Sequence, residues 1–519
     1  MAVGPSYEEG RGILETLFEQ LRGYGRSEIY PYHMPGHKRR GLGDMPGSLA
    51  KLDITEVEGF DNLHQPEGIL EEMQKYAAAA YGAEESYYLV GGSTCGILSA
   101  VSAAIPREGR LLIARNCHKS VFHAAYLRGL QLSYLDPGQV PEVGIPEAVT
   151  ARQVQEALER EQGIQGILIV SPTYEGRIAE VEEIARIAHG YGIPLIVDEA
   201  HGAHLGFYPG FAGGSSRAGA DLVVTSVHKT LPAMTQTALL HANGTLVDRR
   251  MLRRFLRIYQ SSSPSYVLMA SIDNAIRLAR EKVDLFRQMT MNWNRMLEKL
   301  SKCRALTVWP PASLPQAEYQ RHQDMGKLVI SVQGTGITGQ ELYRELLENY
   351  GLQLEMACHS YVLAMFTIAD TVQGYERLTK ALLDMDSRIG RPESRRYFQA
   401  ESGCLASIPT DGIPELGEDV QRSAKTAWEP APPGSRKGMR LSECWDLPVE
   451  WAVLADAVGR SVGEFVSIYP PGTPMLVPGE RLEKADLERI LQYLADGLQV
   501  QGISVKEGRP GLMVLAEQA

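Results

Sequence analysis

The strongest constraint on this chain is a regular alternation of short apolar runs with helical segments over residues 66–245. The apolar runs are YYLV, RLLIA, GILIV, PLIVD, DLVVTS and ALLH. Helical segments separate them, and VEEIARIAHGYG is one example. Strands that alternate with helices are typical of a mostly parallel sheet with helices on both faces. We therefore expect an α/β fold whose ligand site lies at the carboxyl ends of the strands.

The rest of the sequence predicts three further parts around this large domain, which we place at residues 66–280. Residues 1–65, with an amphipathic helix around GILETLFEQLRG, predict an N-terminal arm. Residues 281–390 predict a smaller α/β domain, and residues 391–519 a C-terminal region.

Local patterns refine this division. A long helical connector is expected over residues 266–302, and strands are expected at KLVISV and YVLAMFTI, with a helix at TGQELYRELLENYG between them. The stretch 385–440 is rich in Pro, Gly, Ser and charge and predicts loops or a tether. The final portion, which carries SIYPPGTPMLVPGE, is expected to be helical.

Charge and composition argue against several partners. The chain has 52 basic and 63 acidic residues, a formal net charge of −11, which repels nucleic acid and anionic lipid. The start lacks a secretory signal pattern, and the six cysteines lack metal-ligand spacing, as in reduced cytosolic proteins. We expect a cytoplasmic protein with no metal, nucleic-acid or membrane partner.

The string LIVDEAHG at residues 195–202 suggests a helicase, because such enzymes hold magnesium with a similar strand end. Hydrolysis of that type also needs an upstream glycine loop that closes with Gly-Lys-Ser/Thr. The one candidate, GGSTCG at 91–96, has no lysine. A nucleic-acid motor is therefore disfavoured.

The same segments predict a different site. Lys229 follows the run DLVVTS, Asp198 ends another buried run, and GGST at 91–94 opens a helical segment whose free N–H groups suit a phosphate. Pyridoxal 5'-phosphate needs this set: a lysine for its aldehyde, a carboxylate for its ring nitrogen and an anion cradle. Singly, each feature has an ordinary explanation as a turn, cap or ion pair. Their joint occurrence predicts the cofactor.

Physical chemistry gives each residue a role. A desolvated lysine loses part of its preference for the charged form and condenses with an aldehyde. Asp198 would keep the pyridine nitrogen protonated, which makes the ring an electron sink. Small Ala200 would let the ring approach the strand end. The expected phosphate donors are Ser93, Thr94, Ser226 and His228.

Longer strings resemble the bacterial Orn/Lys/Arg decarboxylases, pyridoxal-phosphate enzymes of the aspartate aminotransferase fold (fold type I). They run from about residue 30 to 480 and are HMPGHKRRG, DITEVEGFDNLHQPEG, ARNCHKSVFHA, PTYEG, VDEAHGAH, SVHKTLPAMTQ, QSSSPSY and YPPGTPMLVPGE. The resemblance implies that Lys229 is the Schiff-base lysine and Asp198 the partner of the ring nitrogen. It implies that His118 stacks on the cofactor ring.

Further positions follow from the same resemblance. Ser93, Thr94, Ser226 and His228 match phosphate-side positions, while Ser261 and Ser262 match a segment that reaches the phosphate from the neighbouring subunit. The resemblance thus implies a homodimer with shared active sites, or a higher oligomer. Glu355 falls where the family has an acidic residue near the distal amine of the substrate.

Three features depart from the family pattern or lack a role. His201, which we expect to bind the cofactor, stands where some relatives have an aromatic residue beside it. About thirty residues precede the matching region, so we expect a short form without the N-terminal wing domain of some members. The clusters HMPGH, with His33 and His37, and YPPG, from Tyr469, have no assigned chemical role, and turn formation is the default interpretation.

We expect decarboxylation of a basic L-amino acid to carbon dioxide and a polyamine-type product. The catalytic candidates are Lys229, Asp198, His118 and His228, with the proton for Cα coming from Lys229 or a neighbour such as His228. The alternatives are an aminotransferase or other chemistry at Cα, and a non-catalytic regulatory homologue. The sequence does not choose among lysine, arginine and ornithine.

Overall fold

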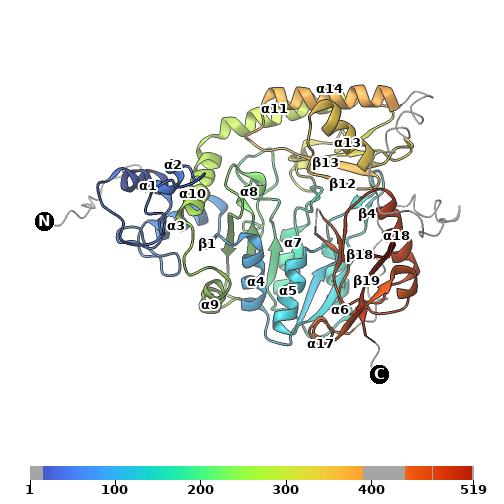
Figure 1. Ribbon diagram of the computed structural model, residues 1–519, viewed down its shortest axis with the longest axis horizontal. Helices are drawn as coiled ribbons and strands as arrows, with labels where there is room; N and C mark the ends of the chain where they lie inside the picture. Colours follow the sequence, from blue (N-terminus) through green and yellow to red (C-terminus); the bar gives the residue numbers. More distant parts are fainter. Residues whose placement is uncertain (1–15, 390–438, 470–471, 517–519) are drawn as a thin grey trace.

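A seven-stranded sheet forms the centre of the computed structural model, which describes residues 16–389, 439–469 and 472–516 (Figure 1). The strand order is β1-β9-β8-β7-β6-β2-β3, and β9 alone in this sheet runs antiparallel to its neighbours. The bounds are β1 Glu85–Leu89, β2 Arg110–Ala114, β3 Gln131–Leu135, β6 Ile164–Val170, β7 Leu195–Asp198, β8 Leu222–Thr225 and β9 Ala238–Ala242. All six predicted runs are strands, which confirms the α/β fold class.

Helices cover both faces of the sheet because neighbouring side chains of a strand point to opposite faces. In β1, Tyr88 packs into one core with α3 and α10, whereas Leu89 packs into a second core with α4 and α5. The helices of this domain are α3 Ile69–Tyr81, α4 Gly92–Ala104, α5 Lys119–Arg128, α6 Ala151–Arg160, α7 Val181–Gly190, α8 Val227–Thr230, α9 Arg249–Tyr259 and α10 Tyr266–Glu281. The stretch 87–106 is strand, loop and helix. A two-stranded sheet joins β4 Gln139–Val140 to β5 Ile145–Pro146.

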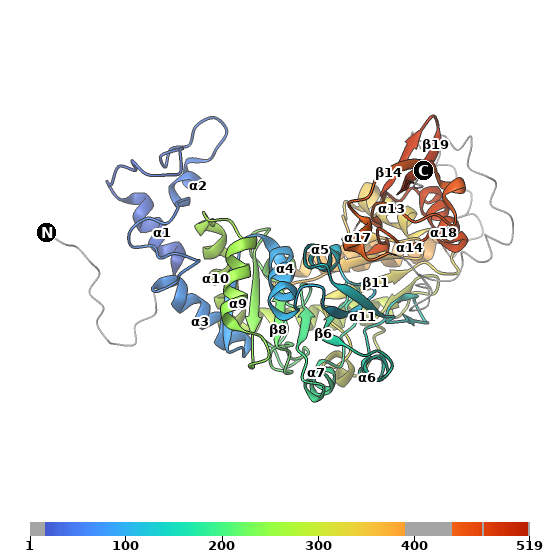
Figure 2. The same ribbon diagram turned by 90° about the horizontal axis from the view of Figure 1, so that it is seen from below.

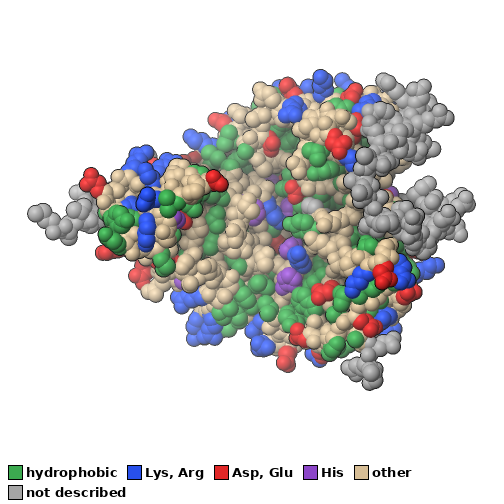
Figure 3. All heavy atoms as spheres, viewed as in Figure 1, with side chains coloured by type: hydrophobic (Ala, Val, Ile, Leu, Met, Phe, Trp, Pro, Cys, Tyr) green, Lys and Arg blue, Asp and Glu red, His purple; other side chains and the backbone are tan. Residues whose placement is uncertain are grey.

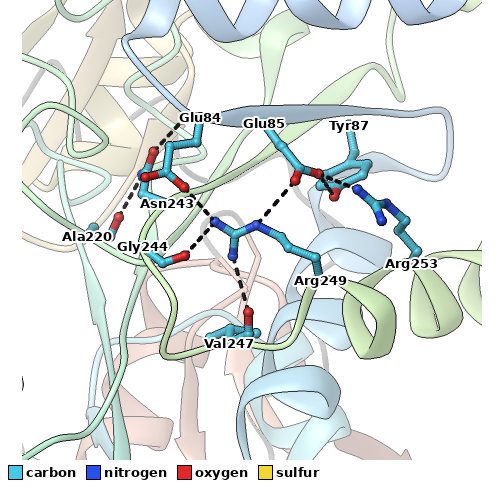
Figure 4. A network of polar contacts seen from close by, with 9 residues as sticks. All are labelled: Glu84, Glu85, Tyr87, Ala220, Asn243, Gly244, Val247, Arg249 and Arg253. Carbon is cyan, nitrogen blue, oxygen red and sulfur yellow. Dashed lines mark hydrogen bonds and ion pairs between the residues drawn. The ribbon is translucent and has the colours of Figure 1, made fainter.

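A network of charged and amide side chains lies at the edge of the sheet where β1 begins and β9 ends (Figure 4). Arg249 of α9 donates to Glu84 at 3.2 Å and to the Gly244 carbonyl at 2.9 Å. Arg253 donates to Glu85 at 2.9 Å. These contacts fix α9 at the end of the sheet opposite the carboxyl ends of the parallel strands.

The second domain is built on the antiparallel sheet β10-β11-β13-β12. The expected helical connector is present, but it consists of α10 and α11, which Lys282 separates. The elements are α11 Val283–Leu300, β10 Thr307–Trp309, α12 Gln316–Tyr319, β11 Lys327–Ser331, α13 Gly339–Tyr350, β12 Met356–Ala357, β13 Tyr361–Met365 and α14 Val372–Ile389. The two strands and the helix predicted here are confirmed. Of the predicted tether at 385–440, residues 390–438 lie outside the described residues.

The C-terminal part corrects one expectation, because its final portion is mainly antiparallel sheet and not helix. Two three-stranded sheets, β14-β19-β18 and β16-β15-β17, pack with a single longer helix, α18. The short strands contain Pro and Gly, so they carry little alternation that a pattern could reveal. The bounds are α17 Leu441–Cys444, β14 Val449–Val453, η2 Leu454–Ala457, β15 Val466–Ile468, β16 Pro474–Leu476, α18 Lys484–Ala495, β17 Val500–Gln501, β18 Ile503–Lys506 and β19 Arg509–Leu515.

The N-terminal segment lies at the opposite end of the molecule, beside α10 (Figure 2). It contains α1 Leu17–Arg26 and α2 Gly47–Leu52. The predicted amphipathic helix starts at Leu17 because Thr16 and Glu19 form a capping box. Among the described residues, no helix is long and apolar enough to cross a bilayer.

Candidate active site

Six strands of the central sheet run in the same direction, and five of them end in or are followed by a side chain of chemical interest. Ser93 follows β1, His118 follows β2, Tyr174 follows β6, Asp198 ends β7 and Lys229 follows β8. Carboxyl ends of parallel strands share one edge of a sheet, so this gathering, except for Tyr174, was predicted from the sequence. Figure 3 shows histidine and basic side chains together in a hollow near the centre of one face.

Lys229 lies on the single turn of α8, half-buried, with its Nζ 3.1 Å from Nε2 of His201. Burial lowers the pKa of Lys229, while the carboxylates of Asp198 and Glu355 raise it. The net direction is downward, so this amine loses its proton more easily than an exposed lysine does. The sequence predicted Lys229, and the structure places it one strand from Asp198.

His201 occupies the loop after β7 and is held from two sides. Its ring lies 4.3 Å from the ring of Tyr174, and its carbonyl faces Nζ of Lys327 at 3.5 Å. Burial, followed by the charge of Lys229, lowers the pKa of His201 well below the usual histidine value and so favours the neutral imidazole. Its Nδ1 is buried without a partner among the described residues. The contact with Lys229 was not predicted from sequence.

Asp198 is 5% exposed, yet its carboxylate accepts one hydrogen bond among the described residues, from the Ala200 N–H at 3.1 Å. Burial raises the pKa of this carboxyl, and Lys229 opposes the shift. A buried carboxylate with so few donors is costly unless a cationic group meets it. A protonated pyridine nitrogen would be such a group.

The expected phosphate-side residues lie at two helix starts. Ser93 and Thr94 are in the first turn of α4, whose N-cap, Gly91, offers no side chain to the free N–H groups. Ser226 is fully buried, and its hydroxyl has no partner within the described part of the chain. An anion at the start of α4 would satisfy such donors.

His228, the residue before Lys229 on α8, is held by a hydrogen bond to the backbone. Its Nδ1 lies 2.8 Å from the Thr237 carbonyl, so Nδ1 carries the proton and a neutral ring leaves Nε2 as an acceptor. Burial lowers the pKa of His228. This geometry suits proton exchange better than donation to a phosphate.

Glu355 stands exposed before β12, and the hydroxyl of Tyr174 donates to its Oε1. Its carboxylate raises the pKa of Lys229, which places it within electrostatic reach of that amine. Tyr174 was not predicted as a site residue, although it lies in the loop after β6, as the predicted residues lie at or after other strand ends.

A buried charge cluster behind the site was also missed. Asp324 Oδ2 pairs with Nζ of Lys327 at 2.9 Å, and Asp324 Oδ1 lies 2.8 Å from Nε2 of His204. Asp324 and Lys327 side chains have no exposed surface, and His204 has 3%. The cluster ties the loop that carries His201 to the start of β11. The lysine that begins the apolar run KLVISV, Lys327, was the signal in the sequence that could have indicated this cluster.

Ser261 and Ser262 are the expected residues that this single chain does not place at the site. Both are exposed after α9, and the Ser261 carbonyl faces Nε2 of His64 at 2.7 Å. Their reach into a neighbouring subunit stays a prediction.

The unpaired groups suit pyridoxal phosphate. A lysine with a lowered pKa faces a buried, poorly paired carboxylate, and an orphaned hydroxyl lies close by along the chain at Ser226. These are the partners that an aldehyde, a ring nitrogen and a phosphate require.

Comparisons with known proteins give the same assignment. The sequence matches "Orn/Lys/Arg decarboxylase, major domain" over residues 15–373 and the C-terminal domain of that family over residues 442–501. An arginine decarboxylase of Bacillus anthracis is 31% identical over 495 residues, covering 94% of each chain. Lysine decarboxylase LdcA of Pseudomonas aeruginosa is 23% identical, covering 93% of this chain and 76% of LdcA. The crystal structure of the Francisella novicida lysine decarboxylase LdcF superimposes with a TM-score of 0.77 at 17% identity, covering 97% of this chain and 81% of LdcF.

The large domain therefore has the fold of the pyridoxal-phosphate enzymes of fold type I. Within that class, the chain belongs to the Orn/Lys/Arg decarboxylase family. It is a pyridoxal-phosphate-dependent carboxy-lyase that acts on a basic amino acid. The predicted family, fold class and reaction are confirmed.

Proposed function

We propose that this decarboxylase acts on L-arginine, with Lys229, Asp198 and Glu355 as the central residues of its site. The observation that carries the proposal is the position of Glu355, an exposed carboxylate within electrostatic reach of Lys229. A carboxylate there matches the cationic end of a substrate whose Cα lies at Lys229. The extent of the match to the Bacillus anthracis arginine decarboxylase supports arginine over lysine and ornithine.

In this proposal the sequence-predicted residues hold the cofactor. Lys229 would bind its aldehyde, Asp198 its ring nitrogen, and His118 would stack on its ring, with Ala200 leaving room at the strand end. The phosphate would be bound by Ser93, Thr94 and Ser226, with Ser261 and Ser262 of a second subunit. Bound pyridoxal phosphate would supply the electron sink for the electron pair that stays at Cα when carbon dioxide leaves.

The side chains of this site orient the substrate and move a proton. Glu355, which accepts from Tyr174, fixes the guanidinium and so aligns the carboxylate at Cα. Lys229, whose pKa burial lowers, holds a transferable proton at Nζ and delivers it to Cα. His228 offers its free Nε2 for proton exchange. A cytoplasmic homodimer with shared sites completes the proposal.

The test is a substrate panel on the purified protein with added cofactor. L-arginine, L-lysine and L-ornithine are supplied separately, and the amine and carbon dioxide are measured. We expect the highest kcat/KM with arginine and agmatine as product. A higher value with lysine or ornithine would refute the arginine assignment, and a keto acid product would point to transamination.

A further inference from the structure

The segment from Tyr469 to Glu480 belongs to a family-like string without an assigned role. Its residues 472–480 come from the C-terminal domain and lie against the loop after β2, which carries His118 at the N-cap of α5. Residues 474–480 are all buried. An element of another domain therefore covers the loop that presents a proposed cofactor contact.

Four hydrogen-bonding contacts and one ion pair join the two segments. The Lys119 N–H donates to the Gly472 carbonyl at 3.3 Å, and Oγ1 of Thr473 donates to the Asn116 carbonyl at 3.3 Å. Arg115 donates to the Pro474 and Met475 carbonyls at 2.7 and 2.9 Å. It also pairs with Glu480 at 3.1 Å, both side chains being 10% exposed.

Gly472 is held directly against His118. Its φ is +81°, a conformation that L side chains rarely adopt. A Cβ at this position would lie 3.4 Å from both Cδ2 and Nε2 of the His118 ring. A methyl group here would therefore strain the backbone, and it would touch the imidazole at van der Waals distance.

We propose that residues 472–480 form a clamp that holds the His118 ring in place for the cofactor, with Gly472, Arg115 and Glu480 as positioning residues. This inference rests on the proposed function, in which His118 stacks on the cofactor ring. It gives the YPPGTPMLVPGE string a role, because this part of the C-terminal domain would fix the position of the His118 ring in the active site.

The pKa of His118 depends on burial and on nearby charges, so it reports whether residues 472–480 still cover the ring. The Ser120 N–H donates to Nδ1 at 3.2 Å, so the neutral ring carries its proton on Nε2, the atom that faces Gly472. Burial lowers the pKa of His118 to about 4, and Lys229, Lys119 and His123 add to the shift. Opening the clamp would hydrate the ring and raise this pKa.

The experiment is a titration of His118 in the full-length apoprotein with carbon-13-labelled histidine, followed by NMR. The His118 signal is assigned by its loss in His118→Gln. In Gly472→Ala and Glu480→Ala we expect the His118 pKa to rise from about 4 toward 6.5. We also expect cofactor affinity to fall up to about tenfold through lost stacking. Glu480→Gln, which keeps one acceptor oxygen for Arg115, should restore most of the wild-type value.

Two controls separate the possible outcomes. Glu488→Ala, which removes a surface pair with Lys484 in the same domain, should change neither quantity. If Gly472→Ala fails to fold, Glu480→Ala and Thr473→Val carry the test. An unchanged His118 pKa in folded clamp variants would overturn the inference. Retention of the visible cofactor absorption in Lys229→Ala would instead overturn the proposed function.

Discussion

Burial and charge act in opposite directions on Lys229. Burial favours the neutral amine, whereas Asp198 and Glu355 favour the ammonium, and the net effect lowers the pKa. A lysine at the end of a buried strand is thus tolerated because carboxylates face it. The same balance leaves an amine that can both bind an aldehyde and return a proton.

Substitution of Glu355 by Gln should weaken substrate binding more than turnover. A hydrogen bond to a charged group is worth about 1.5–3 kcal/mol, which corresponds to roughly a 10- to 100-fold rise in KM for arginine. Steady-state kinetics measures this, with Tyr174→Phe as the matched variant that keeps the carboxylate but removes its donor. An unchanged KM in Glu355→Gln would exclude Glu355 from substrate recognition.

The buried cluster of Asp324, Lys327 and His204 should be sensitive to the loss of one partner. Asp324→Ala leaves the Lys327 cation buried without its carboxylate, a change that costs about 3–5 kcal/mol in comparable pairs. Denaturant unfolding measures it. The exposed pair of Arg152 and Glu156 offers the control, since Glu156→Ala should cost at most about 1 kcal/mol. Equal losses in both variants would contradict this account.

The residues that end or follow strands could be predicted from the sequence, but the contacts between them could not. Lys229 and Asp198 were identifiable because each ends or follows an apolar run. The Tyr174–Glu355 bond joins positions 181 residues apart, and His204 meets Asp324 across 120 residues. Such pairings depend on how the two domains pack, and no local pattern encodes that packing.

The elements themselves were predictable where burial was continuous. β7 and β8 are buried at every position, so their apolar runs mark them plainly. β3 and the short C-terminal strands were missed because their burial is mixed or their length is two to five residues. Apolar runs do not indicate strand direction, so the antiparallel orientation of β9 was not predicted either.

One contact between elements should depend on pH. Nδ1 of His359, in the turn between β12 and β13, lies 2.6 Å from Asp496 at the end of α18. The hydrogen bond to Asp496 raises the pKa of His359, which burial opposes. A raised folded-state pKa stabilises the fold fully below the unfolded value of about 6.5. That contribution disappears as the pH rises through the higher folded-state value.

Thermal unfolding of the wild type and His359→Asn across pH 5 to 9, roughly the range in which histidines titrate, checks this sign. The difference in melting temperature should be largest at the acidic end and shrink as the pH rises. Asp496→Asn should reproduce the loss. A difference that grows with pH would contradict the assigned direction.

The arrangement of the parts bears on assembly. The N-terminal segment projects from one end of the molecule and exposes several large apolar side chains, among them Tyr30, Tyr32 and Met34. A surface of this kind is typical of an interface. It agrees with the proposed homodimer, in which Ser261 and Ser262 serve the neighbouring site.

Shared sites can be tested by mixing two inactive variants. Lys229→Ala should be inactive, and Ser261→Asp with Ser262→Asp should repel the cofactor phosphate. In a mixed dimer one site would combine an intact Lys229 with intact serines, so co-refolding should restore part of the activity. If co-refolded mixtures stay inactive although mixed dimers form, Ser261 and Ser262 do not act across the interface.

Chemical trapping of the cofactor on the protein tests whether Lys229 forms the Schiff base. The holoenzyme is reduced with borohydride, digested and mapped by mass spectrometry. We predict that the cofactor mass is found on the peptide that contains Lys229 and on no other lysine, and that Lys229→Ala carries none. Labelling of a different lysine, Lys327 for example, or equal labelling in Lys229→Ala, would contradict the account.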